Sequence, residues 1–221
     1  MRTLGNIRAE KKLDEYWGFL ISSSPSIPYT ESHSSKRSCF QRKTVGRLHW
    51  LGARKMTLDI FSITLMLSIL LCSLVAGLMF GFAVVVMPGI AKLPDRDYLI
   101  SFKQMDGIIQ NNQPAFMLVW VGSVVSIIVA SILGVQNLVT SQTNLLWLAL
   151  GFYLLGVQLP TARFNIPLNN ALQNMDLMTS EASELATFRL NFETQWNRWN
   201  RFRVFNAIVS VMIMIFLLSQ L

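Results

Sequence analysis

Four long stretches without a charged residue constrain this chain more than any other feature. They cover residues 60–87, 115–135, 145–162 and 204–221. At a rise of about 1.5 Å per residue, a helix over each stretch is close to the length of the roughly 30 Å hydrocarbon core of a bilayer, or longer. Soluble proteins rarely contain four helices that are apolar on all sides. We therefore predict an all-α fold, a four-transmembrane-helix bundle whose main partner is the lipid bilayer.

The net charge of +7 comes from the N-terminal part of the chain. Residues 56–221 contain as many acidic as basic residues, so they form no basic face of the kind that binds nucleic acid. Residues 1–55 mix charges with Ser- and Pro-rich segments and have no sustained period. We predict a basic, disordered N-terminal extension over 1–55 and a membrane domain over 56–221. Met56 stands just before the first apolar stretch, and one interpretation is that 1–55 lies upstream of the true start.

Histidine and cysteine are too few to build the common metal sites. His33 and His49 both lie in the N-terminal extension, and Cys39 and Cys72 are far apart in the sequence. This composition excludes a His-ligated haem or a His-built di-metal site in the membrane domain, and it gives no disulfide framework. A site made of carboxylates alone would be unusual for a transition metal. We expect no metal site.

Small residues recur every four positions in the first two stretches. They are Ser73, Gly77 and Gly81 in the first, and Gly122, Ser126, Ala130 and Gly134 in the second. Small faces let helices approach closely in lipid, where packing drives association. One interpretation is a homo-oligomer formed through the Gly77/Gly81 or Gly122/Ser126 faces. The other, which we favour, is packing of the first two helices against each other within one chain.

The three connections between the stretches differ in length and charge. Asn137–Asn144 is short and uncharged, whereas Pro88–Pro114 and Arg163–Arg203 are long and hold all the charges of the membrane domain except Asp59. With four spans, both long connections must lie on the same side. Their basic residues predict that this side is cytoplasmic, in a plasma (inner) membrane. The basic extension conflicts with this orientation, because parity places it on the other side.

Each long connection contains an amphipathic helical pattern. The first has Tyr98, Phe102, Met105 and Ile109 at helical spacing, and the second has Leu185, Phe188, Phe192, Trp196 and Trp199 on one face. We predict two amphipathic interfacial helices on one side of the membrane. The first should stop before Pro114. The second should begin at Ser180 as its N-cap and run on into the fourth span.

Two short segments resemble each other. Met87–Leu93 follows the first span and Ile166–Leu172 follows the third, and both have an apolar residue and a proline, then a leucine five residues after that proline. A tandem duplication of a helix–loop–helix unit would explain the match. Chance similarity is the alternative, and the sequence does not decide between them.

The order of several motifs resembles a known family. A span ending Met87-Pro88-Gly89 is followed by Leu93-Pro94, by Asn112–Pro114, by Phe164–Asn169, and by Trp196–Arg203 before the last span. This pattern resembles the DUF1772 family, also called the anthrone oxygenase-like family, over about residues 65–218. Most members are uncharacterised small membrane proteins. Some fungal members are linked to the oxidation of anthrones to anthraquinones, with oxygen and no evident cofactor.

The resemblance implies a cofactor-independent oxidoreductase for a lipophilic aromatic, anthrone- or quinone-like substrate at one membrane interface. Such chemistry needs a base to remove a proton and donors to hold the resulting negative charge. The candidate catalytic residues are Asp106 and Glu193 as bases, with Arg163 and Arg203 as holders of the oxyanion. The candidate substrate-binding residues are Asn112, Asn165, Asn169 and Asn200, with Trp196 and Trp199 as planar surfaces.

Each candidate also has a purely structural interpretation. Trp196 and Trp199 fit an interfacial aromatic belt. Arg163, Arg201 and Arg203 fit anchors to lipid headgroups. Asn165, Asn169 and Asn170 fit caps and turns after a helix that Pro167 ends. On this interpretation the chain is a non-enzymatic four-helix membrane protein that binds lipid or a partner helix.

Overall fold

The computed structural model describes residues 59–221, which are helical almost throughout. Four helices in this part are long and apolar enough to cross a membrane: Ile60–Ile90, Pro114–Asn137, Thr140–Gln173 and Ala182–Leu218. The predicted all-α fold with four membrane-spanning helices is therefore confirmed. The expectations for residues 1–55, including the start at Met56, fall on residues outside the described part.

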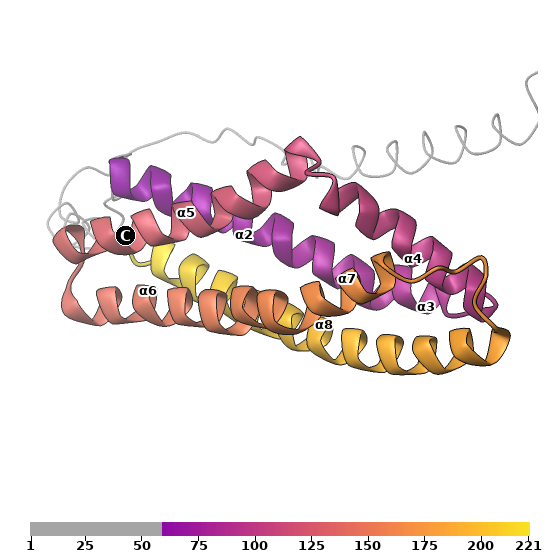
Figure 1. The fold of residues 1–221 in the computed structure, drawn as a ribbon. Coiled ribbons are helices and arrows are strands. Elements are labelled where there is room, and N and C mark those ends of the chain that lie inside the picture. The colour runs from indigo at the N-terminus through magenta and orange to yellow at the C-terminus, as the bar shows by residue number, and fades with distance from the viewer. Residues whose placement is uncertain (1–58) are drawn as a thin grey trace, which may run out of the picture. The chain divides into compact units, whose positions relative to one another are not determined.

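The spans form a bundle of two hairpins joined by a short turn (Figure 1). The first hairpin pairs α2 (Ile60–Gly81) with α5 (Pro114–Asn137), and the second pairs α6 (Thr140–Tyr153) with α8 (Ala182–Leu218). α2 also packs on α8, so the core lies between all four helices. Buried side chains such as Leu65, Ile127, Tyr153 and Met214 fill this core.

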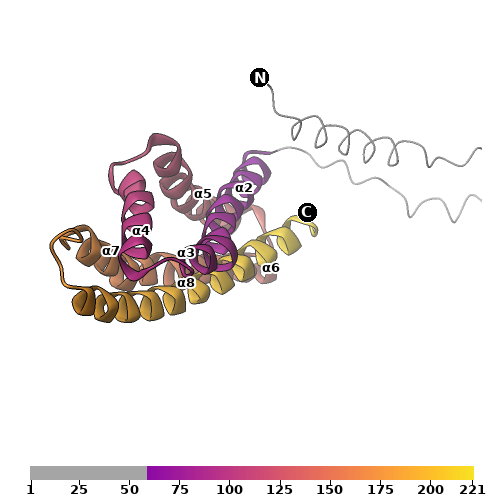
Figure 2. The same cartoon turned by 90° about the vertical axis from the view of Figure 1, so that its right-hand side faces the viewer.

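The two long connections lie together at one end of the bundle, as parity of four spans requires (Figures 1 and 2). α3 (Met87–Ile90) and α4 (Asp95–Gln110) belong to the first connection, and α7 (Ile166–Gln173) belongs to the second. α4 contacts both α7 and α8. This packing forms a second hydrophobic cluster, in which Tyr98, Phe102, Leu172, Phe192 and Trp196 are buried.

Each proline inside the spans follows a π-helical segment. η1 (Phe82–Val86) precedes Pro88, η2 (Leu154–Gln158) precedes Pro160, and η3 (Thr161–Asn165) precedes Pro167. A proline has no N–H to donate, and its ring crowds the carbonyl four residues before it. The wider π turn gives that carbonyl room, so the helix bends without breaking. The Met87 and Ile166 motifs thus share one local structure, which fits the duplication hypothesis without deciding it.

Three local expectations need correction. The helix does not end at Pro167, because α7 continues to Gln173, so Asn165, Asn169 and Asn170 are helical residues and not caps or turn residues. Ser180 is not the N-cap of the last helix. That position belongs to Glu181, whose side chain forms no capping hydrogen bond. The helix nevertheless runs unbroken into the fourth span, as predicted.

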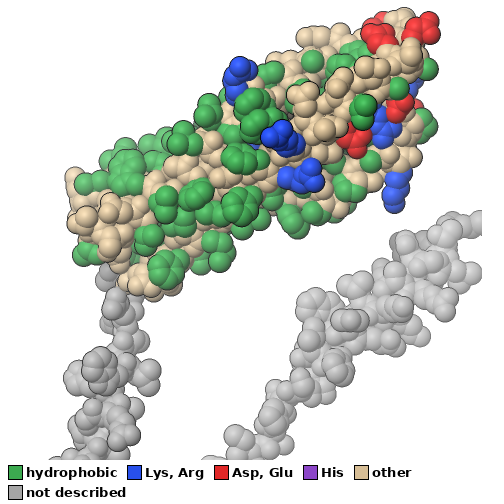
Figure 3. All heavy atoms as spheres, turned by 90° about the horizontal axis from the view of Figure 1, so that it is seen from below, with side chains coloured by type: hydrophobic (Ala, Val, Ile, Leu, Met, Phe, Trp, Pro, Cys, Tyr) green, Lys and Arg blue, Asp and Glu red, His purple; other side chains and the backbone are tan. Residues whose placement is uncertain are grey.

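The exposed surface of the spans is apolar. Large hydrophobic side chains such as Leu70, Val85, Leu118, Phe205 and Met212 are exposed. Figure 3 shows hydrophobic side chains over one part of the molecule and charged side chains towards the opposite end. This arrangement is that of a protein whose outer surface faces lipid.

The small-residue faces behave differently from each other. A Cβ on Gly122 would lie 3.2 Å from the Leu71 side chain of α2, and Ala130 is fully buried. The second ladder therefore packs within the chain. A Cβ on Gly77 or Gly81 would meet nothing within 4 Å in the described residues. Association of copies through the Gly77/Gly81 face stays a prediction.

One glycine marks the tightest approach between helices. A Cβ on Gly156 would overlap the Asn206 side chain on α8, whereas a Cβ on Gly151 would meet nothing within 4 Å in the described residues. We expect Gly156→Ala to destabilise the protein by about 1–3 kcal/mol, the usual cost of overpacking. Thermal unfolding of the purified protein in detergent measures the effect.

Gly151→Ala is the matched control, because it makes the same change in the same span. It should leave the unfolding midpoint unchanged or raise it, since alanine is the better helix former. Equal midpoints for the two variants would contradict this close packing of η2 on α8.

Candidate functional site

A cavity of about 370 Å³ lies at the end of the bundle where the long connections pack. Its walls come from α2, η1, α4, α5, η3, α7 and α8, so all four spans contribute. Most of the lining is apolar or aromatic, including Phe82, Phe102, Phe116, Trp120 and Trp196. The size and the apolar walls with few polar groups are typical of a small-molecule site.

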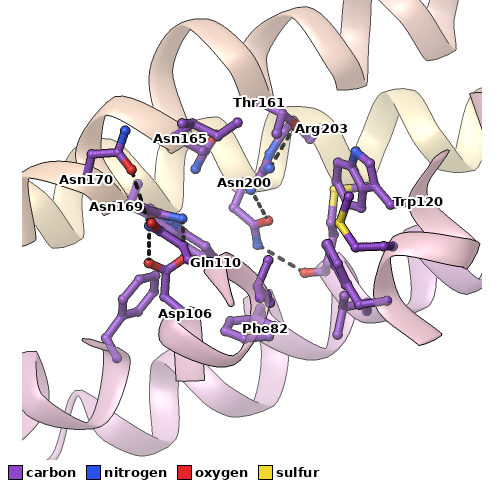
Figure 4. A pocket seen from close by; sticks show the side chains of 18 residues that line it. Phe82, Asp106, Gln110, Trp120, Thr161, Asn165, Asn169, Asn170, Asn200 and Arg203 are labelled. Carbon is purple, nitrogen blue, oxygen red and sulfur yellow. Dashed lines mark hydrogen bonds between the residues drawn. The ribbon is translucent and has the colours of Figure 1, made fainter. Parts of the chain in front are cut away.

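A buried carboxylate lies on one side of this cavity (Figure 4). Asp106 is only 4% exposed. Its Oδ1 accepts a hydrogen bond from Nδ2 of Asn169 at 2.7 Å. Its Oδ2 accepts two more at 2.8 Å, from Nε2 of Gln110 and Nε2 of Gln173. Three neutral amides therefore surround a carboxylate that forms no ion pair in residues 59–221.

The partners of these amides fix which way each one points. The indole Nε1 of Trp196 can only donate, and it donates to Oδ1 of Asn169 at 2.9 Å. Asn169 must therefore turn its nitrogen towards Asp106. Nε2 of Gln173 also donates to the Lys103 carbonyl at 2.9 Å, which fixes that amide in the same way. Both oxygens of Asp106 thus act as hydrogen-bond acceptors.

A buried guanidinium lies on the other side of the cavity (Figure 4). Arg203 is 5% exposed. Nη1 donates to the Thr161 hydroxyl at 3.0 Å, and Nη2 donates to Oδ1 of Asn200 at 2.9 Å. The Asn200 amide then donates to the Met79 carbonyl on α2 at 3.0 Å. Nε of Arg203 is buried and has no hydrogen-bond partner in the described residues.

Besides Arg203, Asn165 is a cavity-lining residue with buried polar atoms that lack a partner in the described part of the chain. It is 2% exposed and lines the cavity, and neither its amide nitrogen nor its amide oxygen has a hydrogen-bond partner in the described residues. Leaving such groups unpaired costs about 1–3 kcal/mol each. The donor of Arg203 and both ends of Asn165 therefore mark where a polar atom of a ligand would be stabilised.

The π segments bring these polar groups to the cavity. Thr161 and Asn165 are the first and last residues of η3. Met79, whose carbonyl accepts from Asn200, lies in the last turn of α2 before η1. The polar lining thus occurs where two spans adjust to their prolines.

Aromatic packing holds the carboxylate side in place. Trp196 packs edge-on against Phe102 with ring centres 5.1 Å apart, and it also contacts Phe82 at 5.8 Å. Phe102 in turn packs edge-on against Phe192 at 4.8 Å. Asp106 stands one turn after Phe102 on α4. The packing of Phe102 therefore helps to fix the position of the Asp106 carboxylate at the cavity.

Arg189 on α8 connects this aromatic cluster to the first long connection. Its Nη1 donates to the Leu93 carbonyl at 2.8 Å and to Asp95 at 2.9 Å, and its Nη2 donates to the Ala91 carbonyl at 2.7 Å. The guanidinium also lies 4.4 Å from the centre of the Tyr98 ring. Burial raises the pKa of the Tyr98 phenol, whose hydroxyl has no partner in the described part. Arg189 thereby ties the first connection to α8.

The structure brings six of the ten candidate residues to the cavity: Asp106, Asn165, Asn169, Trp196, Asn200 and Arg203. The other four do not line it. Glu193 pairs with Arg189 at 3.2 Å, and Asn112 lies in the turn before α5 with φ 56°. Arg163 is exposed, and Trp199 stacks on Phe164 with ring centres 3.7 Å apart.

Several residues of the site are not predicted from the sequence. Gln110 was one turn beyond Asp106 on the same helix face, a signal that sequence reasoning could have used. Thr161 falls within the uncharged stretch 145–162, and Gln173, which binds Asp106 without lining the cavity, lies in no distinguishing motif. Within residues 59–221 no group of three or more His, Cys, Asp or Glu side chains is placed to hold a metal ion.

Comparison with known proteins agrees with the resemblance seen in the sequence. Residues 107–213 match the model of a family described as anthrone oxygenase. The matched range begins one residue after Asp106 and contains Asn165, Asn169, Asn200 and Arg203. No curated protein and no solved structure matches the chain.

Replacing the buried carboxylate by an amide tests the network around it. Asp106→Asn would present an N–H₂ group to donors that now meet an acceptor, so at least one hydrogen bond is lost and two donors face each other. We expect a loss of about 1–3 kcal/mol of stability, measured by thermal unfolding in detergent.

Asp97→Asn is the matched control, since Asp97 is exposed in the first turn of the same helix. It should cost less, because it removes only a favourable interaction with the helix dipole. An Asp106→Asn midpoint equal to that of the control would contradict the assignment of Asp106 as an acceptor of three hydrogen bonds.

Proposed function

We propose that this membrane protein, which carries a domain of the anthrone oxygenase family over residues 107–213, oxidises a flat, lipophilic aromatic ketone with molecular oxygen. The observation that carries the proposal is that a buried carboxylate and a buried guanidinium stand on different sides of one apolar cavity. Asp106 and Arg203 both line this cavity, and neither is neutralised by an opposite charge in the described part. Buried charges without a counter-charge are costly, and they are most often found where function requires them.

The reaction converts an activated methylene group into a carbonyl. The methylene carbon first loses a proton, and the negative charge spreads onto the oxygen of the ring ketone. Oxygen then adds at that carbon to give a peroxide anion, which takes back the proton from the base to form a hydroperoxide, and the hydroperoxide loses water to leave the new carbonyl. One oxygen atom of O₂ enters the product and the other leaves as water, so O₂ is the oxidant and the methylene group is oxidised.

Asp106 is suited to the proton transfer. Its three amide partners hold the carboxylate oxygens in fixed positions at the cavity wall, and a fixed base within reach of an acidic C–H is what general-base catalysis requires. Glu193, the other candidate base, is paired with Arg189 and does not line the cavity. We therefore assign the role to Asp106.

Arg203 and Asn165 are suited to holding the charge that develops. The Arg203 guanidinium is oriented by its hydrogen bonds to Thr161 and Asn200. Its Nε–H has no partner in the described residues and is free to donate to a ligand. The Asn165 amide nitrogen is also an unpaired donor at the same cavity. Donors fixed in advance in an apolar site stabilise a developing oxyanion strongly, because they need no reorganisation.

A second function is favoured by one feature of the carboxylate. Three hydrogen bonds occupy most of the acceptor capacity of Asp106, which also fits an anchor that orders the cavity for a bound molecule without chemistry. On this alternative the protein binds a lipophilic molecule at the same place and turns nothing over.

Oxygen consumption with anthrone separates the two functions. We expect purified full-length protein in detergent to accelerate anthraquinone formation with matching O₂ uptake. Asp106→Asn should lower the rate by about 10²-fold or more, the usual contribution of a general base. Arg203→Gln should lower it by about 10²–10³-fold, as for loss of an oxyanion donor.

Glu184→Gln is the matched control on α8, because Glu184 is exposed and outside the cavity. Its rate should equal that of the wild-type protein. Saturable anthrone binding without O₂ uptake would replace the enzymatic proposal by the binding alternative. An unchanged rate in Asp106→Asn, together with loss of activity in Glu193→Gln, would reassign the base.

A further inference from the structure

Three exposed arginines stand at the charged end of the spans. Within the described residues, Arg163, Arg198 and Arg201 donate no hydrogen bond and form no ion pair. Four other basic residues are engaged. Arg96 and Lys103 donate to backbone carbonyls, Arg189 ties the first connection to α8, and Arg203 is buried beside the cavity.

Stacked aromatic rings hold two of these arginines in one arrangement. Phe164 and Trp199 stack with ring centres 3.7 Å apart and planes only 5° from parallel. The guanidinium of Arg163 lies 5.8 Å from the centre of the Phe164 ring, and that of Arg198 lies 6.0 Å from the centre of the Trp199 ring. The stack thus joins η3 to α8 and carries one cation beside each ring.

Arg201 completes the set. It is three residues beyond Arg198 on α8, so both side chains project from the same side of that helix. We call Arg163, Arg198 and Arg201 the arginine rim. No acidic residue occurs between 107 and 175 or between 194 and 221, and the nearest one along the chain, Glu193, pairs with Arg189.

The arginine rim lies where the surface changes from charged to apolar. Arg163 follows directly on the uncharged stretch 145–162, and Arg201 stands shortly before the stretch 204–221. One turn after Arg201, Phe205 is 65% exposed. Figure 3 shows basic side chains at the border between the hydrophobic part of the surface and the more polar end. In a bilayer, the phosphate groups lie at the border between the apolar core and water.

We propose that the arginine rim is a binding site for the phosphate of an anionic phospholipid. Each guanidinium offers several N–H donors in a fork that matches phosphate oxygens. The stacked rings beside it provide a flat apolar surface at the depth where the headgroup meets the acyl chains. No acidic side chain within residues 59–221 forms an ion pair with the rim, so the lipid phosphate supplies the opposite charge.

Native mass spectrometry of the full-length protein tests the site. The protein is reconstituted with equal amounts of phosphatidylglycerol and phosphatidylcholine and then released from the membrane mimic. We expect the wild-type protein to retain phosphatidylglycerol in preference to phosphatidylcholine. Each single Arg→Gln change in the rim should weaken phosphatidylglycerol retention about fivefold, which corresponds to about 1 kcal/mol per basic residue near an anionic surface.

Lys92→Gln is the matched control, because Lys92 is an exposed cation in the first long connection at the same end and is not part of the rim. It should leave lipid retention unchanged. Arg198→Lys should retain more lipid than Arg198→Gln, since it keeps the charge. Unfolding midpoints of the rim variants equal to the wild type exclude a folding defect as the cause.

Three outcomes would overturn the proposal. One is equal retention of the two lipids by the wild-type protein. Another is retention of phosphatidylglycerol by Arg163→Gln, Arg198→Gln and Arg201→Gln at the wild-type level. The third is displacement of the lipid by millimolar inorganic phosphate, which would identify a site for a free anion. None of these outcomes depends on whether the protein oxidises anthrones.

Discussion

The structure depends on how three prolines are accommodated inside helices that cross lipid. A proline removes one N–H from the helix, and in a bilayer no water is available to bond the carbonyl that loses its partner. In this chain a π segment precedes Pro88, Pro160 and Pro167 in every case. The π turn changes which side chains face the bundle, and it does so at the same end of the first and third spans.

The cavity is a direct consequence of those two adjusted spans. η3 brings Thr161 and Asn165 to the cavity, and the Met79 carbonyl just before η1 accepts the Asn200 amide. A regular α-helix through Pro167 would rotate Thr161 and Asn165 relative to each other, because a π turn contains more residues. Thr161 accepts a hydrogen bond from Nη1 of Arg203, so the position of Thr161 within η3 bears directly on how the guanidinium is held. Proline positions and site chemistry are therefore linked through helix geometry.

The fold could be predicted from the sequence because hydrophobicity over whole spans decides it. The uncharged stretches 60–87 and 115–135 lie within helices of the structure, and the place where α4 stops follows from Pro114. Pro167 was misjudged for a physical reason. Proline ends most helices in water, whereas a span packed between neighbours can continue through it by widening one turn. The amino-acid sequence alone does not distinguish these two outcomes, because the packing of neighbouring helices decides between them.

The candidate site could be predicted only as a set of residue types near one end. Asp106, Asn169 and Arg203 were recognised because charged and amide side chains stand out beside apolar spans. Glu193 and Arg163 stood out for the same reason, yet Glu193 faces Arg189 and Arg163 faces outwards. On α8, Arg201 and Arg203 are only two residues apart, and the helical turn between them sends one to the surface and the other to the cavity. Helical phase relative to the other spans therefore separates the outer arginines from the inner one, and that phase is set by tertiary packing such as the contact of Asn200 with Met79.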